Sequence, residues 1–291
     1  MYSEKVKKMK INFTKMHGAG NDYVYINCFE QPIKRPQKLS MLVSRRHFSI
    51  GSDGLILILP SEKADFRMRM FNADGSEGKM CGNATRCIAK YVYDHKMTDK
   101  HDITLETLSG IKNIHIDTDD CGKFLSATVN MGAPILESAK IPCLIDSKEV
   151  IDWPADICGQ KFNITCVSMG NPHCVVFVPN VDELNLEILG PKFENNEIFP
   201  ERTNTEFVEI VNDNTIKIRV WERGSGETLA CGTGACASVV ASILNHKINT
   251  DTVTAKLIGG DLTIKWTGED VFMSGPAVTA YEGIIEVEGE Y

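Results

Sequence analysis

The sequence predicts an α+β protein of two homologous domains related by a pseudo-two-fold, each a mostly antiparallel sheet wrapped around a central helix. Three features of the 291-residue chain carry this prediction. The second half resembles the first at a shift of 150 positions, each half contains several short strand-like segments, and each contains one longer helical segment. A repeat this long with mixed elements indicates two domains rather than a solenoid.

The first matched elements are a turn and a strand. Gly20-Asn21 falls on Gly170-Asn171, and each pair leads into an apolar run, residues 23–26 in one half and 174–178 in the other. Short apolar runs that follow a glycine turn favour buried strands.

Two further strands follow in both halves. Residues 55–59 fall on 205–209, and the alternating segment 66–71 falls on 216–221. Alternation with a period of two predicts strands with one buried face.

The next matched elements are two cysteines, each followed by a helix. Cys81 falls on Cys231, and apolar residues recur at helical spacing over 84–93 and 235–244. We therefore expect each cysteine to open a helix.

Both halves close with a strand and a Gly-Pro turn, at 131–134 and 273–276. Residues 142–159 have no counterpart of matching composition. We expect them to form an insertion or the connection between the halves.

Composition limits the classes of function. Hydrophobic residues make up 43% and charged residues 24%, and no apolar run is long enough to cross a bilayer, so we expect a soluble protein without a membrane partner. The net charge of −8 argues against nucleic acid and favours a small-molecule partner.

The ten cysteines do not indicate a secreted disulfide framework. The first ten residues lack the apolar stretch of a secretory signal, so we expect a short solvated tail and a reducing, cytoplasmic location. No Cys-x-x-Cys pair occurs, so we expect no metal site.

A free cysteine is usually a small buried hydrophobic residue. We apply that interpretation to four cysteines without special context: Cys28, Cys121, Cys143 and Cys158. Cys81 and Cys231 differ because they are equivalent in the repeat, precede glycines and lie where helix N-terminal amides are unpaired.

A helix N-terminus stabilises an anion through its free amides and its dipole. We expect it to lower the thiol pKa from about 8.5 toward neutrality. The carboxylate of a bound amino acid can use the same amides, and Gly82 and Gly232 let the backbone approach it closely.

Two such cysteines suit the inversion of a carbon centre. One thiolate removes a proton from one face and the other thiol delivers a proton to the opposite face, which requires no pyridoxal cofactor. The two ionisations are expected to be coupled and to give a bell-shaped pH profile.

Several long motifs closely resemble the diaminopimelate epimerase family. They are His-Gly-Ala-Gly-Asn-Asp at 17–22, Asn-Ala-Asp-Gly-Ser-Glu at 72–77, Cys-Gly-Asn-Ala-Thr-Arg at 81–86, Met-Gly-Asn-Pro-His at 169–173, Glu-Arg-Thr-Asn at 201–204, Glu-Arg-Gly-Ser-Gly-Glu at 222–227 and Cys-Gly-Thr-Gly-Ala-Cys at 231–236. The resemblance extends from Ile11 over nearly the whole chain.

The resemblance implies roles for individual residues. Cys81 and Cys231 correspond to the two catalytic residues, and His173 and Glu222 to polar groups that assist them. The implied substrate-binding residues are Asn21, Asn72, Gly82, Asn83, Asn171, Asn204, Glu222, Arg223, Gly232 and Thr233. Gly54 stands where some members have a substrate-contacting glutamine, so its role stays open.

The resemblance also implies the reaction, the interconversion of LL- and meso-diaminopimelate without a cofactor, in lysine and peptidoglycan-precursor biosynthesis. Because family members exchange their terminal strands, it implies domains of 1–127 plus 279–291 and of 128–278. A homodimer is an option that the sequence leaves open.

Two alternatives belong to other classes. A proline or hydroxyproline racemase uses the same two cysteines, but its cyclic substrate would leave Arg223 and Glu222 unpaired in a closed site. A catalytically silent amino-acid-binding protein would keep the fold and the ligand without turnover.

Overall fold

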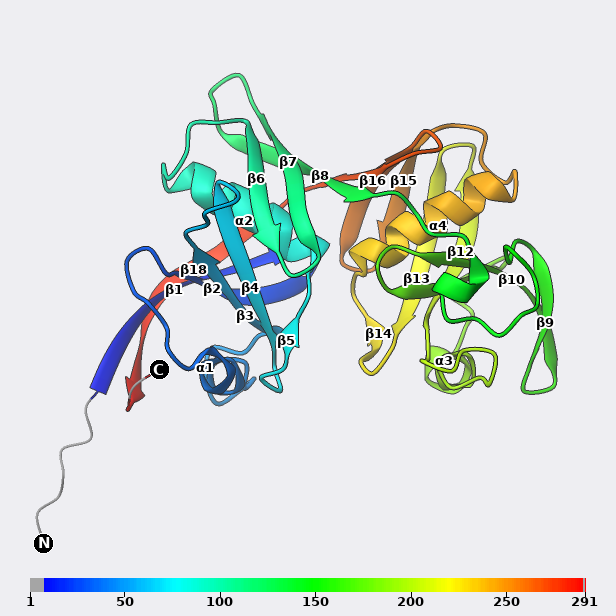
Figure 1. Ribbon diagram of the computed structural model, residues 1–291, viewed down its shortest axis with the longest axis horizontal. Coiled ribbons are helices and arrows are strands. Elements are labelled where there is room, and N and C mark those ends of the chain that lie inside the picture. The colour runs from blue at the N-terminus through cyan, green and yellow to red at the C-terminus, as the bar shows by residue number, and fades with distance from the viewer. Residues whose placement is uncertain (1–7, 290) are drawn as a thin grey trace, which may run out of the picture. The chain divides into compact units, whose positions relative to one another are not determined.

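The computed structural model describes residues 8–289 and 291, and these form two compact units. One unit comprises the chain up to Val129 together with the segment from Pro276 onward, and the other comprises Asn130–Gly275. Figure 1 shows that strands dominate both units and that few helices accompany them. The predicted α+β class with a repeated domain is confirmed.

The first unit contains the first eight strands and the last one. They are β1 (Lys8–Gly18), β2 (Asn21–Asn27), β3 (Gly54–Leu59), β4 (Phe66–Asn72), β5 (Glu77–Gly78), β6 (Asp102–Thr107), β7 (Gly110–Thr118), β8 (Phe124–Gly132, which runs past the boundary) and β18 (Val278–Glu288).

The second unit repeats these elements. Its strands are β9 (Trp153–Ile157), β10 (Gln160–Ser168), β11 (Pro172–Phe177), β12 (Asn204–Asn212), β13 (Thr215–Glu222), β14 (Gly226–Thr228), β15 (Thr252–Leu257), β16 (Gly260–Trp266) and β17 (Val271–Gly275).

The strand pairings have the same order in both units. The first unit pairs β18-β1-β2-β3-β4-β6-β7-β8 and the second β9-β10-β11-β12-β13-β15-β16-β17, with β5 and β14 as short hairpin partners of β4 and β13. Each sheet is antiparallel except at two pairs of parallel strands. These are β2–β3 and β4–β6 in the first unit, and β11–β12 and β13–β15 in the second. The C-terminal β18 thus takes the place beside β1 that β9 takes beside β10.

Each unit has one long and one short helix. The long helices, α2 (Gly82–Asp94) and α4 (Gly232–Leu244), pack against strands of their own unit. The short helices, α1 (Pro36–Val43) and α3 (Leu186–Glu194), contact the neighbouring strands β3 and β4 or β12 and β13. The sequence pattern predicted the long helices but not the short ones, which have only two or three turns.

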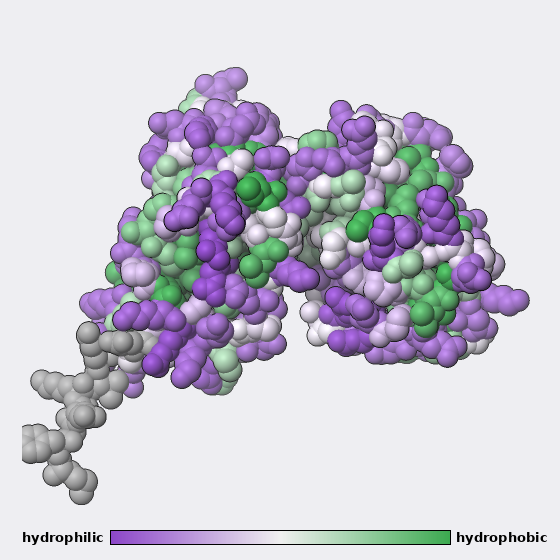
Figure 2. Space-filling model, viewed as in Figure 1, coloured by the Kyte–Doolittle hydropathy of each residue, from purple (hydrophilic) through white to green (hydrophobic). Residues whose placement is uncertain are grey.

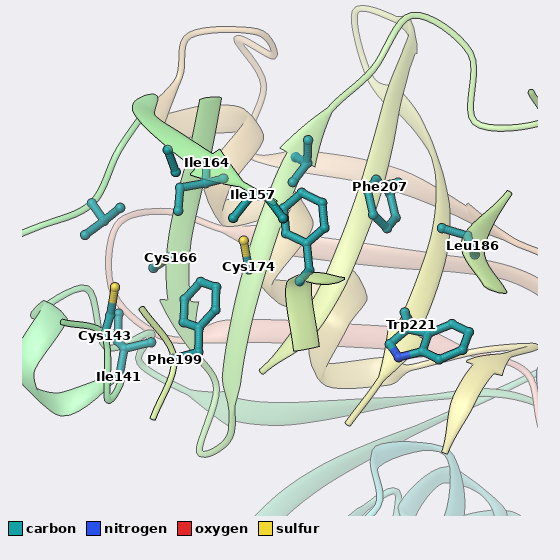
Figure 3. Close-up of a cluster of buried hydrophobic side chains, with 14 of the residues drawn as sticks. Ile141, Cys143, Ile157, Ile164, Cys166, Cys174, Leu186, Phe199, Phe207 and Trp221 are labelled. Carbon is teal, nitrogen blue, oxygen red and sulfur yellow. The ribbon is translucent and has the colours of Figure 1, made fainter. Parts of the chain in front are cut away.

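Apolar side chains fill the space between sheet and helix. In the second unit the cluster includes Phe207 and Trp221 from the sheet, Phe193 from α3 and three cysteines, Cys143, Cys166 and Cys174 (Figure 3). In the first unit β3 is buried along nearly its whole length, because helices cover the sheet around it.

Some expectations are corrected. Residues 142–159 are not the connection between the units, because they lie inside the second unit and contain β9. Of the expected N-terminal tail, residues 1–7 lie outside the described residues, whereas Lys8–Lys10 begin β1. Cys121 and Cys158 are exposed at turns rather than buried, and Cys28 is only partly buried.

Hydrophilic side chains cover most of the visible face of each unit, with hydrophobic residues in small groups between them (Figure 2). Among the described residues, no helix has both the length and the apolar character that crossing a membrane demands.

Candidate active site

Cys81 is the N-cap of α2, as predicted. Its extended backbone begins the helix, and its Sγ accepts a hydrogen bond from the Ala84 amide at 3.5 Å. The thiol also donates to Asn21 Oδ1 at 3.3 Å, and Asn83 Nδ2 lies 3.5 Å from the same oxygen. Three predicted site residues therefore meet at one helix start.

A network of charges holds Asn21. Its Nδ2 donates to Asp53 Oδ2 at 2.8 Å, while Arg46 bridges Asp53 and Asp22 at 3.0 and 2.8 Å. Lys15 pairs with Asp22 from the buried side. Burial raises the pKa of Asp22, but hydrogen bonds and charges from Lys15 and Arg46 outweigh it, so this pKa lies below its ordinary value.

A buried arginine supports the same helix start. Arg86 is fully buried, and its Nη2 donates to Asn83 Oδ1 at 2.8 Å. Asn72 lies at the end of β4 and donates to Ser76 Oγ at 2.9 Å, within the turn that precedes the cysteine. A role for Asn72 in substrate binding stays a prediction.

Cys231 is the N-cap of α4 and is 6% exposed. Its Sγ accepts from the Gly234 amide at 3.4 Å and lies 3.4 Å from Thr233 Oγ1. Burial, and then the charges of Glu222 and Glu206, raise the pKa of the Cys231 thiol well above its ordinary value. The expectation of a lowered pKa is therefore wrong for Cys231, because burial and two carboxyl groups outweigh the helix N-terminus.

Glu222 ends β13 and accepts a hydrogen bond from Thr228 Oγ1 at 2.5 Å. Burial raises the pKa of its carboxyl group, and the charge of Glu206 adds to this effect, against the lowering influence of Thr228 and His173. Glu222 therefore holds its proton to a higher pH than an exposed glutamate does.

The raised pKa of Glu222 predicts a pH-dependent stability. Between the unfolded value, about 4.3, and the higher folded value, the native state binds more protons, so the free energy of unfolding falls as pH rises. In Glu222→Gln this part of the decline should vanish. Urea unfolding at several pH values between roughly 4 and 7 measures it. Glu187→Gln, an exposed change on α3, should follow the wild type, and an unchanged slope in Glu222→Gln would contradict the assignment.

His173 is fully buried between two acceptors. Nδ1 lies 2.7 Å from Glu206 Oε1, and Nε2 lies 3.1 Å from Asn171 Oδ1. Glu206 is also fully buried, and its Oε2 has no hydrogen-bond partner among the described residues. The site thus contains a buried acid and base in direct contact.

Arg223 is held at its backbone and at its side chain. Asn204 Oδ1 accepts from the Arg223 amide at 2.9 Å, and Arg223 Nη1 donates to the Glu201 carbonyl at 2.8 Å. Buried Glu194 accepts hydrogen bonds from the Gly224 amide at 2.9 Å and from Trp221 Nε1 at 2.7 Å. These two donors come directly before and after Glu222-Arg223 in the sequence.

The structure gathers the predicted residues in two groups, one in each unit. Asn21, Cys81, Gly82 and Asn83 surround the start of α2, with Asn72 in the strand that leads toward it. Asn171, His173, Glu222, Cys231, Gly232 and Thr233 surround the start of α4, with Asn204 and Arg223 on adjoining strand ends.

Sequence reasoning missed Glu206, Arg86, Glu194 and the partners of Asn21. A signal for Glu206 was present, because it is a charged residue in an apolar strand where the first half has Ile56. Gly54, left unassigned, has a packing reason: an added Cβ would lie 2.1 Å from the Phe71 carbonyl oxygen.

Two glutamates outside the predicted site form matching ion pairs. Arg69 binds both oxygens of Glu77, and Arg219 binds both oxygens of Glu227, each at 2.7 and 2.9 Å. These pairs hold the hairpins before each cysteine. Within residues 8–289 and 291, no group of three or more potential ligands among His, Cys, Asp and Glu is arranged to hold a metal ion.

Sequence comparison finds one matching family over most of the chain. The model of the family described as diaminopimelate epimerase matches residues 13–137 and 165–280. A diaminopimelate epimerase of Methanococcus maripaludis is 55% identical over 279 residues, which cover 95% of this chain and 100% of the relative. One of Acetivibrio thermocellus is 54% identical, with 95% and 99% covered.

Solved structures share the fold at low sequence identity. A phenazine biosynthesis protein of the PhzF family from Bacillus anthracis has a TM-score of 0.69 at 19% identity, covering 96% of this chain and 100% of that one. A hydroxyproline epimerase from Agrobacterium vitis has a TM-score of 0.69 at 12% identity, with 96% and 92% covered. At these identities the likeness extends to the fold alone.

Proposed function

Because this chain belongs to the diaminopimelate epimerase family and is therefore an epimerase, we propose that it interconverts LL- and meso-2,6-diaminopimelate with Cys81 and Cys231 as acid and base. The product would serve lysine and peptidoglycan-precursor biosynthesis in the cytoplasm. The observation that carries the mechanism is that both cysteines are helix N-caps whose sulfur accepts the amide of the third helical residue.

The proposed reaction moves one proton at each cysteine. A thiolate on one face removes the α-proton, and the carbanion takes a proton from the thiol on the opposite face, which becomes the new thiolate. The thiol–thiolate pair is thereby restored with the roles exchanged, and the reaction needs no cofactor. The backbone amides at both helix starts, at Gly82-Asn83 and Gly232-Thr233, would stabilise the reacting carboxylate as negative charge develops beside it.

The non-reacting end of the substrate gives the polar residues a second task. Arg223 would pair with the distal carboxylate, and Glu222 together with the Asn171 carbonyl would accept from the distal ammonium. Asn204 supports this arrangement, because its side chain holds the Arg223 backbone and the Pro172 carbonyl at the same time.

The test follows the α-protons of LL-diaminopimelate by proton NMR in deuterated buffer with reduced protein. Formation of meso product that carries deuterium at the inverted centre is the expected result. If the α-protons persist under reducing conditions, the proposed function is wrong. Proline and hydroxyproline, assayed in parallel, test the racemase alternative, because neither has a second charged end for Arg223 to bind.

A further inference from the structure

The two helix starts differ in their buried charges, although the repeat makes them equivalent in position. Positions 23, 56 and 72 of the first unit hold Tyr, Ile and Asn, whereas the equivalent positions of the second unit hold His173, Glu206 and Glu222. The second unit therefore has three ionisable side chains around its cysteine where the first has none that ionises near neutral pH.

The fit of Glu206 against α4 depends on a second difference in the repeat. Ala84 of α2 corresponds to Gly234 of α4. A Cβ at Gly234 would lie 2.5 Å from Glu206 Oε1 and 3.2 Å from Cys231 Sγ, so an alanine would collide with the carboxyl group. The missing methyl group thus lets the carboxyl group of Glu206 lie directly against the first turn of α4, next to the Cys231 sulfur.

His173 fixes this carboxyl group in place. Its Nδ1 contacts Glu206 Oε1 at 2.7 Å, both side chains are fully buried, and Asn171 holds the opposite ring nitrogen. A carboxylate buried this deeply requires a partner to offset its desolvation, and His173 is its hydrogen-bond partner. The carboxyl group also lies against the first turn of α4, where the helix dipole favours a negative charge. The groups that face Glu206 are His173 from β11, Glu222 from β13 and Cys231 with the first turn of α4.

We propose that Glu206 is a positioning residue of the reaction: its carboxylate lies against the first turn of α4, beside the Cys231 sulfur, and so keeps Cys231 as a thiol in the substrate-free enzyme. This inference rests on the proposed function for its meaning in catalysis. Its physical basis is that two negative charges, a carboxylate and a thiolate, cannot both lie at one buried helix start without a large electrostatic cost. The raised pKa of Cys231 agrees with this arrangement.

The first unit has a buried cation near its helix start instead. Buried Arg86 lies on α2 where α4 has Cys236, and it contacts Asn83 next to Cys81. A buried cation favours a nearby thiolate, whereas a buried carboxylate opposes one. We therefore expect Cys81 to lose its proton at a lower pH than Cys231.

The test is the pH dependence of iodoacetamide alkylation, with each cysteine measured separately by mass spectrometry of its peptide, over roughly pH 6 to 11. In wild-type protein the midpoint for Cys231 should lie above that for Cys81. In Glu206→Gln the Cys231 midpoint should fall by about one pH unit, while the Cys81 midpoint in the same sample stays unchanged. Glu209→Gln makes the same change on β12 away from His173 and should leave both midpoints as in the wild type.

The pH dependence of the reaction rate is a second measurement, and it would not change if Glu206 had a purely structural role. The alkaline limb of the pH–rate profile reports loss of the thiol proton, so Glu206→Gln should shift that limb to lower pH by the same amount as the alkylation midpoint. An unmoved or higher Cys231 midpoint in folded Glu206→Gln would overturn the proposal. If this variant does not fold, a wild-type Cys231 midpoint below that of Cys81 would overturn it instead. Alkylation needs no turnover, so the proposal and the epimerase assignment can fail separately.

Discussion

Replacing either Cys81 or Cys231 with alanine is expected to lower kcat for epimerisation by at least about 10³-fold while the protein stays folded. Each thiol is one half of the proton relay, and a positioned acid or base contributes about 10² to 10⁴-fold. Because the two cysteines act as a unit, the double variant should be scarcely worse than either single one. Conversion of LL- to meso-diaminopimelate, followed by NMR, is the measurement.

The control for thiol loss is Cys158→Ser, an exposed position that should leave kcat unchanged. Calorimetric titration of the alanine variants with meso-diaminopimelate shows whether they still bind the ligand after losing catalysis. A catalytically silent binding protein would also bind the ligand, but its wild type would show no turnover. Retention of more than about a tenth of wild-type kcat in either variant would contradict the two-cysteine mechanism.

Replacing Arg223 with alanine is expected to lower kcat/KM for diaminopimelate by about 10²-fold. The variant loses a charge-assisted, bidentate contact with the distal carboxylate, and such contacts contribute about 1.5 to 3 kcal/mol. Arg223→Lys should restore part of the loss, because lysine keeps the charge without the planar pair of donors. Steady-state kinetics of all variants under reducing conditions measures this effect.

Arg67→Ala, a change at a partly exposed arginine of the first unit, is the matched control and should leave kcat/KM unchanged. An Arg223→Ala variant with wild-type kcat/KM would mean that the substrate has no second carboxylate at this place. The proline-type alternative would then be favoured, since its substrate carries only one.

The repeat made most of the fold predictable. A strand or helix predicted in one half strengthened the prediction of its equivalent in the other half. The segments around β2, β3, β4 and α2, and their counterparts in the second unit, were therefore assigned correctly. The short helices α1 and α3 had no such signal, because two or three turns of amphipathic sequence resemble loop sequence. The segment 142–159 was misplaced because composition alone does not say which sheet edge a strand joins.

For the site, position in the repeat located the two cysteines and their helix starts. The raised pKa of Cys231 could not be predicted, because it comes from burial and from the charges of Glu222 and Glu206. Glu206 lies 25 positions earlier in the sequence and reaches the helix only through the parallel pairing of β11 with β12 and the absence of a Cβ at Gly234. A local motif contains the helix start but not the carboxyl group that folding brings to it.

The place of β18 has a consequence for the synthesis of the protein. The second unit is one continuous stretch, residues 130–275, whereas the first unit takes the strand beside β1 from residues 278–288. A ribosome releases the chain from its N-terminus at about 5 to 20 residues per second, so the second unit is fully translated before the strand that completes the first. Until residues 278–288 have been synthesised, the edge of β1 is an unpaired strand that nascent-chain chaperones or another copy of the chain can bind.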